Sequence, residues 1–122
     1  MPKKVRVGFQ GVGGAFSEIA AAKLVPRVSE RVGFPSFPAL FRALAGDKVD
    51  CAVIAIENTL AGSIHENYDL LVRYRLPILA ETSVRIVHNL IAKPGVSLRS
   101  VRKIYSLPVA LQQCRQFLER HR

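Results

Sequence analysis

The chain has 122 residues, of which 49% are hydrophobic and 22% are charged, and its formal net charge is +9. This length suits about one domain, and the composition excludes a disordered chain. No apolar run approaches the roughly 20 residues that a membrane span needs, and the run at residues 7–9 is too short for a secretory signal. We therefore expect a soluble, cytoplasmic protein that does not bind membranes.

The cysteines and histidines give no sign of a disulfide or a metal site. Cys51 and Cys114 lie within apolar patterns, and without a secretion signal we expect them to be reduced core thiols. The histidines lack the spacing of metal ligands, so neither a metal nor another cofactor is expected. The basic residues are spread along the chain, and their one local cluster, residues 99–103, has no interleaved aromatics, which favours a solvated basic surface over a nucleic-acid site.

The first half of the chain alternates between strand and helix patterns. Strands are expected over residues 5–9, 31–34 and 49–56, and the last is apolar enough to be buried on both faces. One helix is expected from Phe16 to the break before Pro26. Another is expected between a cap at Ser36 and a stop at Gly46. The order β-α-β-α-β predicts an α/β fold with a mostly parallel sheet.

The second half predicts a third helix, a long extended segment and a final helix. Ser63 is expected to cap the third helix, which Pro77 closes. The apolar face of that helix is expected to consist of Ile64, Tyr68, Leu71 and Val72. Residues 78–92 are strand-like but longer than the usual 5–6 residues or so, as in a segment that crosses between lobes. A short strand at 103–105 and a helix that opens at 106–108 follow.

These patterns place a lobe boundary near residue 80. We expect a first α/β lobe over residues 1–80 and the start of a second lobe over residues 81–122. A second lobe with so few elements would be incomplete. The chain would then be a fragment, or a partner would complete its sheet.

Residues 56–64 are the most informative segment. They read IENTLAGSI and follow the third predicted strand, where open α/β sheets bind ligands. Glu57 at the end of a buried strand would cost desolvation unless it is paired. The alternative is that Glu57 forms a salt bridge to an arginine or caps the next helix.

Three predicted helix starts pair backbone N–H groups with a serine hydroxyl, at Ser17, Ser63 and Ser106. If they converge, they form a site for a ligand with several carboxylates. The alternative is that these serines are ordinary caps. The glycines at 11–14 match neither G-x-G-x-x-G nor a P-loop, so a tight strand-to-helix turn is favoured there.

The motifs together resemble the prephenate dehydratases and the similar arogenate dehydratases. Residues 7–18, VGFQGVGGAFSE, resemble the family's "YQGxxGAYSE" pattern, and residues 56–64 with YDLL at 68–71 resemble its Glu-Asn-Thr block. The segments at 79–91 and 105–114 resemble its "GE…hHxLl" and "SHPQALxQC" patterns. The resemblance implies a two-lobed, periplasmic-binding-protein-like fold with mostly parallel sheets, of which the second lobe is incomplete here.

Some positions depart from the family patterns. Leu107 replaces the usual histidine, Val109 the usual glutamine, and Ala55 the usual proline. The later "TRF" motif and a regulatory ACT domain do not occur in the chain. We therefore expect little or no activity from these 122 residues alone.

The resemblance implies conversion of prephenate to phenylpyruvate in phenylalanine biosynthesis, a carbon–oxygen lyase reaction without a cofactor. The implied catalytic residues are Glu57, Asn58 and Gln113, and the implied substrate-binding residues are Ser17, Thr59, Ser63 and Ser106. Beside a dianion in a closed cleft, the pKa of Glu57 is expected to rise. The expected partner is prephenate or arogenate, with a homo-oligomer left open. The alternative is an inactive module that binds an aromatic or dicarboxylate ligand or serves assembly.

Overall fold

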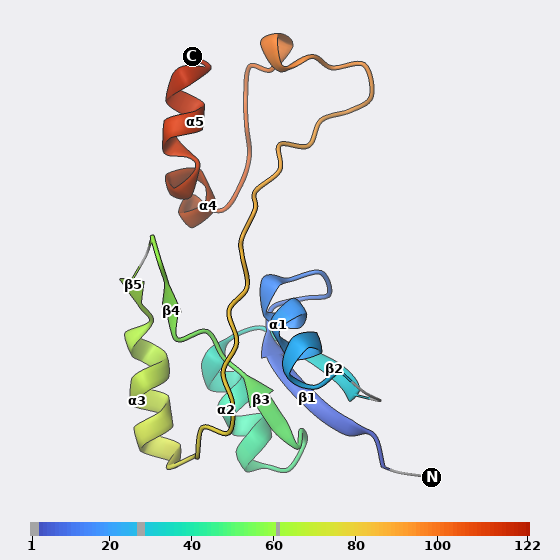
Figure 1. Cartoon of the computed structure of the whole chain (residues 1–122), viewed down its shortest axis with the longest axis vertical. Helices are drawn as coiled ribbons and strands as arrows, with labels where there is room; N and C mark the ends of the chain where they lie inside the picture. Colours follow the sequence, from blue (N-terminus) through green and yellow to red (C-terminus); the bar gives the residue numbers. More distant parts are fainter. Residues whose placement is uncertain (1–2, 27–28, 61) are drawn as a thin grey trace. The chain divides into compact units, whose positions relative to one another are not determined.

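The computed structural model describes residues 3–26, 29–60 and 62–122. Its contacts divide the chain into two compact units, Met1–Arg85 and Ile86–Arg122, which we call unit 1 and unit 2. Figure 1 shows the order of the elements along the chain. The predicted lobes over residues 1–80 and 81–122, and the two-lobed arrangement, stay predictions.

Unit 1 is built on a three-stranded parallel sheet of order β2-β1-β3. Strand β1 (Val5–Gln10) lies between β2 (Ser29–Phe34) and β3 (Cys51–Val53). The central strand buries two of its side chains, Val7 and Phe9. The predicted α/β class and the parallel sheet are therefore confirmed.

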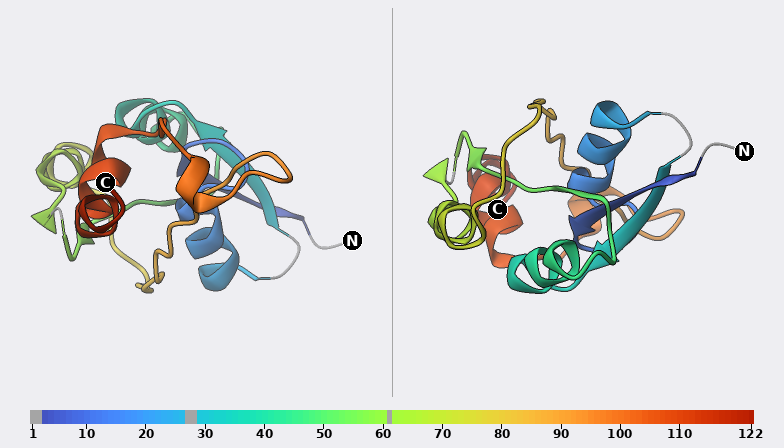
Figure 2. Two further views of the ribbon diagram at one scale, coloured as in Figure 1. Left: turned by 90° about the horizontal axis from the view of Figure 1, so that it is seen from above. Right: turned by 90° about the horizontal axis from the view of Figure 1, so that it is seen from below.

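Helices α1 (Phe16–Leu24) and α2 (Phe37–Ala45) lie on opposite faces of this sheet (Figure 2). The chain first moves from β1 to β2 and then returns past β1 to β3, and right-handed crossovers in these two opposite directions place their helices on opposite faces. The Ser36 hydroxyl accepts the Ala39 N–H at 3.3 Å, and Gly46 is the C-cap of α2. Both predicted helix boundaries are confirmed.

The strand predicted over residues 49–56 is only partly correct. β3 ends at Val53, and residues 54–56 are half-buried without ladder partners. They lead into a hairpin of β4 (Glu57–Asn58) and β5 (Gly62–Ser63), which are antiparallel. Apolar composition alone did not separate a short strand from a buried connection.

The third helix, α3 (His65–Tyr74), buries a different face from the predicted one. Asn67 and Leu70 are buried, whereas Tyr68 and Val72 are 42% and 77% exposed. The helix packs against α2, where the Tyr74 ring lies 5.5 Å from that of Phe41. The sequence of α3 has apolar residues on more than one side of the helix. The side that is buried is the one that packs against α2.

The core of the described residues lies entirely in unit 1. Its hydrophobic members are Val7, Phe9, Ala21, Leu40, Phe41, Ala43, Val49 and Leu70.

Unit 2 contains a 3-10 turn, η1 (Leu98–Ser100), and two short helices, α4 (Pro108–Gln113) and α5 (Arg115–Arg120). The predicted final helix is divided at Cys114. The strands predicted over residues 78–92 and 103–105 are wrong, because neither segment, as the structure describes it, forms a ladder. A strand needs a neighbouring strand, and side-chain alternation does not supply one.

Candidate functional site

The strand order of unit 1 contains a topological switch point, which is where open α/β sheets bind their ligands. The chain leaves β1 toward one neighbour, β2, and later returns to the other side as β3, so the topology switches between β1 and β3. Ligands occupy the crevice outside the carboxyl ends of strands at such a switch point. The glycine turn at 11–14 follows β1, and the hairpin at 57–63 follows β3 by a few residues. The topology thus directs both segments to the same edge of the sheet.

The hairpin is fastened to the start of α3. The Ile64 N–H donates to the Ile56 carbonyl at 2.9 Å, and the Asn67 side-chain amide donates to the Ala55 carbonyl at 2.7 Å. These two carbonyls directly precede β4. Both bonds therefore hold the residues that lead into Glu57.

The hairpin carries four of the predicted site residues, Glu57, Asn58, Thr59 and Ser63. Glu57 and Ser63 are register partners across the hairpin, so the carboxylate and the hydroxyl belong to neighbouring positions. The Asn58 Oδ1 accepts the Leu60 N–H at 3.0 Å, which shapes the turn. Asn58 is half-buried, and Thr59 is exposed.

The structure of this segment differs from two expectations. Glu57 was expected at the end of a buried strand, but it is exposed in β4, so it does not carry the expected desolvation cost. Ser63 was expected to cap α3, but it lies in β5, and Ile64 is the N-cap without a side-chain bond. Both differences follow from the hairpin, which the sequence pattern did not reveal.

The glycine turn is occupied by a carboxylate of the chain itself. Gly11 and Gly14 have φ values of 121° and 91°, which favour glycine. The Gly14 N–H donates to Glu18 Oε2 at 2.7 Å, and Arg31 Nε lies 3.4 Å from Glu18 Oε1. The Gly14 N–H, more than Arg31, lowers the pKa of Glu18. The turn thus binds an anion as its backbone geometry predicts, and that anion is Glu18.

Ser17 stays within α1 and does not cap it, because the N-cap is Ala15. Helix α1 packs against β1, β2 and β3, and among the described residues it makes no contact with the hairpin. The structure therefore places Ser17 near the same sheet edge without bringing it to Glu57.

Unit 2 carries the remaining predicted site residues, Ser106 and Gln113. Ser106 is exposed and precedes Leu107, the N-cap of α4, so it does not cap that helix. Gln113 is half-buried, and its Oε1 lies 2.7 Å from His88 Nε2. His88 was assigned no role from the residues themselves. The sequence signal for a role of His88 was its position in the segment at 87–91, which resembles a family motif.

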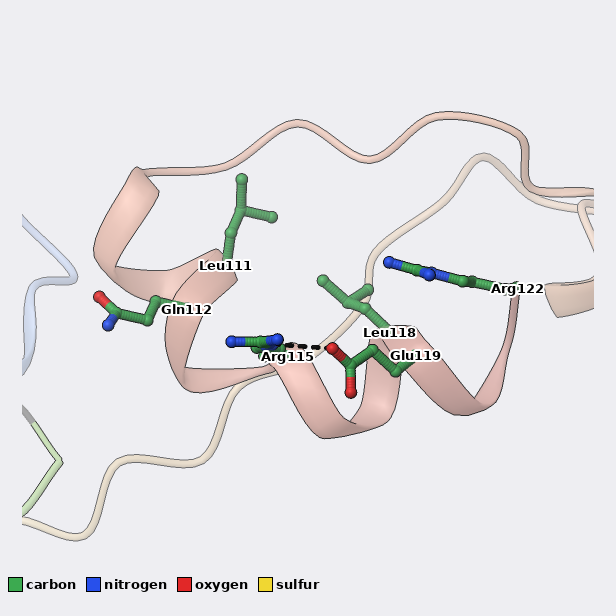
Figure 3. Close-up of a pocket in the computed structure, with 6 residues that line it drawn as sticks. All are labelled: Leu111, Gln112, Arg115, Leu118, Glu119 and Arg122. Atoms are coloured by element: carbon green, nitrogen blue, oxygen red, sulfur yellow. Dashed lines mark hydrogen bonds and ion pairs between the residues drawn. The ribbon is translucent and has the colours of Figure 1, made fainter.

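A hollow of about 300 Å³ lies along α4 and α5 (Figure 3). An ion pair between Arg115 Nε and Glu119 Oε1, 2.7 Å long, forms part of it. Its lining residues are Leu111, Gln112, Arg115, Leu118, Glu119 and Arg122. None of the predicted site residues is among them.

The described side chains give no cluster of three His, Cys, Asp or Glu residues that could hold a metal ion. None of the helices that the structure describes combines the length and the apolar character of a membrane span. Cys51 and Cys114 are free and only half-buried, so their expected core positions are partly correct.

Comparison with known proteins identifies related sequences over almost the whole chain. A family model described as prephenate dehydratase matches residues 7–122. Arogenate dehydratase/prephenate dehydratase 2 of Arabidopsis thaliana is 46% identical over 115 residues, which cover 94% of this chain and 30% of that protein. Arogenate dehydratase 2 of Petunia hybrida is 47% identical over 111 residues, which cover 91% and 28%. The chain thus spans less than a third of the length of these relatives.

The comparisons also correct one prediction and settle the family. The sequence predicted a cytoplasmic location, and this prediction is wrong, because the matching Arabidopsis relatives are named as chloroplastic. A targeting segment sets the compartment of a protein, and the composition of a folded domain does not. The family model covers far more than half of the chain, and it agrees with the motifs at the glycine turn and the hairpin. The chain therefore belongs to the prephenate dehydratase family.

Proposed function

We propose that the protein acts as a dehydratase that removes water and carbon dioxide from prephenate, or from its amino analogue arogenate. The observation that carries the proposal is the hairpin at 57–63, which presents a carboxylate, an amide and hydroxyls beside the switch point of a parallel sheet. Membership of the family supplies the reaction class. The hairpin is exposed, so a ligand can reach its side chains, and hydrogen bonds at its base hold these side chains in place.

The chemistry defines what the site must do. The ring carboxylate leaves as carbon dioxide, and the electrons of its bond to the ring enter the new aromatic system. The ring hydroxyl leaves as water and needs a proton or strong hydrogen bonds as charge develops on its oxygen. In this proposal Glu57 lies closest to the leaving hydroxyl, and it serves the reaction when protonated.

The substrate carries two carboxylates, so the site also needs hydrogen-bond donors. The amides of Asn58 and Gln113 and the hydroxyls of Thr59, Ser63, Ser17 and Ser106 are the proposed donors. The chain has 18 Lys and Arg residues against 9 Asp and Glu, which favours the approach of a dianion. Asn58 is the best supported of these residues, because its bond to Leu60 fixes its orientation within the hairpin.

Substitution of Glu57 by Gln tests the proposal. In the complete natural protein we expect Glu57→Gln to lower kcat with prephenate or arogenate by about 100-fold, since general acid catalysis contributes on this scale. Glu66→Gln is the matched control, because Glu66 is an exposed glutamate in the first turn of α3 and changes the charge equally. An unchanged rate and pH profile for Glu57→Gln would remove Glu57 from the chemistry.

A further inference from the structure

Asn67 is the only buried polar residue among those that the structure describes, with 0% exposure. It lies on α3 one turn before Leu70, which is buried on the same face. Its Oδ1 is buried and has no hydrogen-bond partner among the described residues. An unpaired buried acceptor destabilises a fold, so an apolar side chain of similar size would suit the packing better.

The side chain and the backbone N–H of Asn67 bond opposite ends of the hairpin, and only the side-chain bond depends on asparagine. Its Nδ2 donates to the Ala55 carbonyl at 2.7 Å, on the chain that enters the hairpin. Its backbone N–H donates to the Ile64 carbonyl at 3.0 Å, on the chain that leaves it. The Ile64 N–H in turn donates to the Ile56 carbonyl at 2.9 Å. Asn67 thus closes a small network at the base of the hairpin, next to Glu57.

We propose that Asn67 is a positioning residue, which holds the hairpin at 57–63 so that Glu57 and Asn58 meet the substrate in a fixed orientation. The inference rests on the proposed function of that hairpin. Because β3 ends at Val53, no ladder holds residues 54–56. Without the Asn67 side-chain bond, the bond from the Ile64 N–H to the Ile56 carbonyl is the one bond among the described residues that still joins the entering chain to the leaving chain at the base, and a single bond acts as a pivot. Two bonds, to the successive carbonyls of Ala55 and Ile56, also fix the direction in which the hairpin leaves α3.

Replacement of Asn67 by Leu separates positioning from stability. Asn67→Leu removes the unpaired Oδ1 and leaves the Ala55 carbonyl unpaired, so these two effects on the stability of the folded state oppose each other. In the complete natural protein, we expect kcat to fall by about 10- to 100-fold, as misplacement of catalytic groups produces, with a small change in KM. In the present chain, we expect the Ile64 amide to exchange its hydrogen faster and the signals of Glu57 and Asn58 to shift.

Leu70→Ala is the control, since Leu70 is buried on the same helix face but makes none of these bonds. We expect it to lower the unfolding temperature while kcat and Ile64 exchange are retained below that temperature. Equal losses of kcat in both variants, or unchanged kcat and exchange in folded Asn67→Leu, would overturn the proposal. Should Asn67→Leu fail to fold, Asn67→Ala gives the same comparison.

The two proposals fail in different ways. Absence of turnover in the unsubstituted complete protein would refute the proposed function. The exchange of the Ile64 amide does not depend on turnover, so it would still decide whether Asn67 holds the hairpin.

Discussion

The two units of the chain are held together to very different degrees. Every buried side chain among the described residues belongs to unit 1, where Val7, Phe9 and Leu40 are almost completely enclosed. In unit 2, the large apolar side chains Leu98 and Phe117 are 45% and 42% exposed. Helices as short as those of unit 2 have little stability without tertiary packing. The structure of unit 1 is therefore enforced by its core, whereas that of unit 2 rests on local signals.

The same difference separates the predicted site residues into two groups. The hairpin with Glu57 is bonded to α3, which packs on the core through Leu70. Gln113 and Ser106 lie in unit 2, where the bond of Gln113 to His88 joins two half-buried or exposed side chains. Substitutions in the two units should therefore differ sharply in their effects.

The largest difference is expected for leucines. Leu40→Ala should lower the free energy of unfolding by about 2–5 kcal/mol, because it leaves a cavity in the core of unit 1. Leu98→Ala should change it by less than about 0.5 kcal/mol, as exposed substitutions do. Urea unfolding of both variants measures the difference. Equal losses would show that unit 2 contributes to the cooperative core.

A smaller effect is expected for glycine in the central strand. A Cβ on Gly8 would lie 2.5 Å from Leu40 Cδ1, so Gly8→Ala should overpack the core and cost about 1–3 kcal/mol. Gly13→Ala is the control, because nothing lies within 4 Å of the Cβ that it adds. Thermal unfolding compares them, and a stable Gly8→Ala variant would mean that β1 tolerates a wider spacing from α2.

The smallest effect concerns an ion pair at the edge of unit 1. Arg6 binds both carboxylate oxygens of Asp50, and this side-chain bond, with that of the Arg6 N–H, lowers the pKa of Asp50. A lowered pKa stabilises the folded state above the ordinary carboxyl pKa of about 3.9, and the contribution is lost as the pH falls through the lowered value. Asp50→Asn should therefore weaken the fold at neutral pH and make unfolding less steep in acid.

The comparison for this ion pair is Glu119→Gln in unit 2. It breaks the exposed pair with Arg115 and should leave the unfolding of unit 1 unchanged. Acid titration followed by circular dichroism distinguishes the two variants. An identical acid transition in Asp50→Asn and the parent would exclude a role for the Arg6–Asp50 pair.

The sequence predicted unit 1 well because local and tertiary signals agree there. The Ser36 cap and the Gly46 stop enclose an apolar helix. The alternation of strands and helices is itself enough to predict that β1 pairs with its neighbours in a parallel sheet. The predictions failed where the outcome depends on a neighbour. The strand-like residues 78–92 form no ladder with any strand that the structure describes, and α3 turns its Asn67–Leu70 face toward the core because α2 lies there.

The predicted site residues stay a prediction, but the structure shows which of them lie together. The cluster from Glu57 to Ser63 was recognised from its position after an apolar run, but the hairpin that displays it was not. The burial of Asn67 was not predicted, because buried positions on a helix face are usually apolar and asparagine is usually exposed. The contact of His88 with Gln113 joins residues 25 positions apart, so local sequence patterns could not predict it.

The most direct test of the account is whether the hairpin contacts the substrate. Titration of the isotope-labelled protein with prephenate, followed by amide NMR signals, measures this for each residue. We predict that the signals of residues 57–60 and of Gly62 and Ser63 shift together and saturate at one concentration. Shifts confined to the glycine turn at 11–14 or to unit 2, with an unchanged hairpin, would contradict the account.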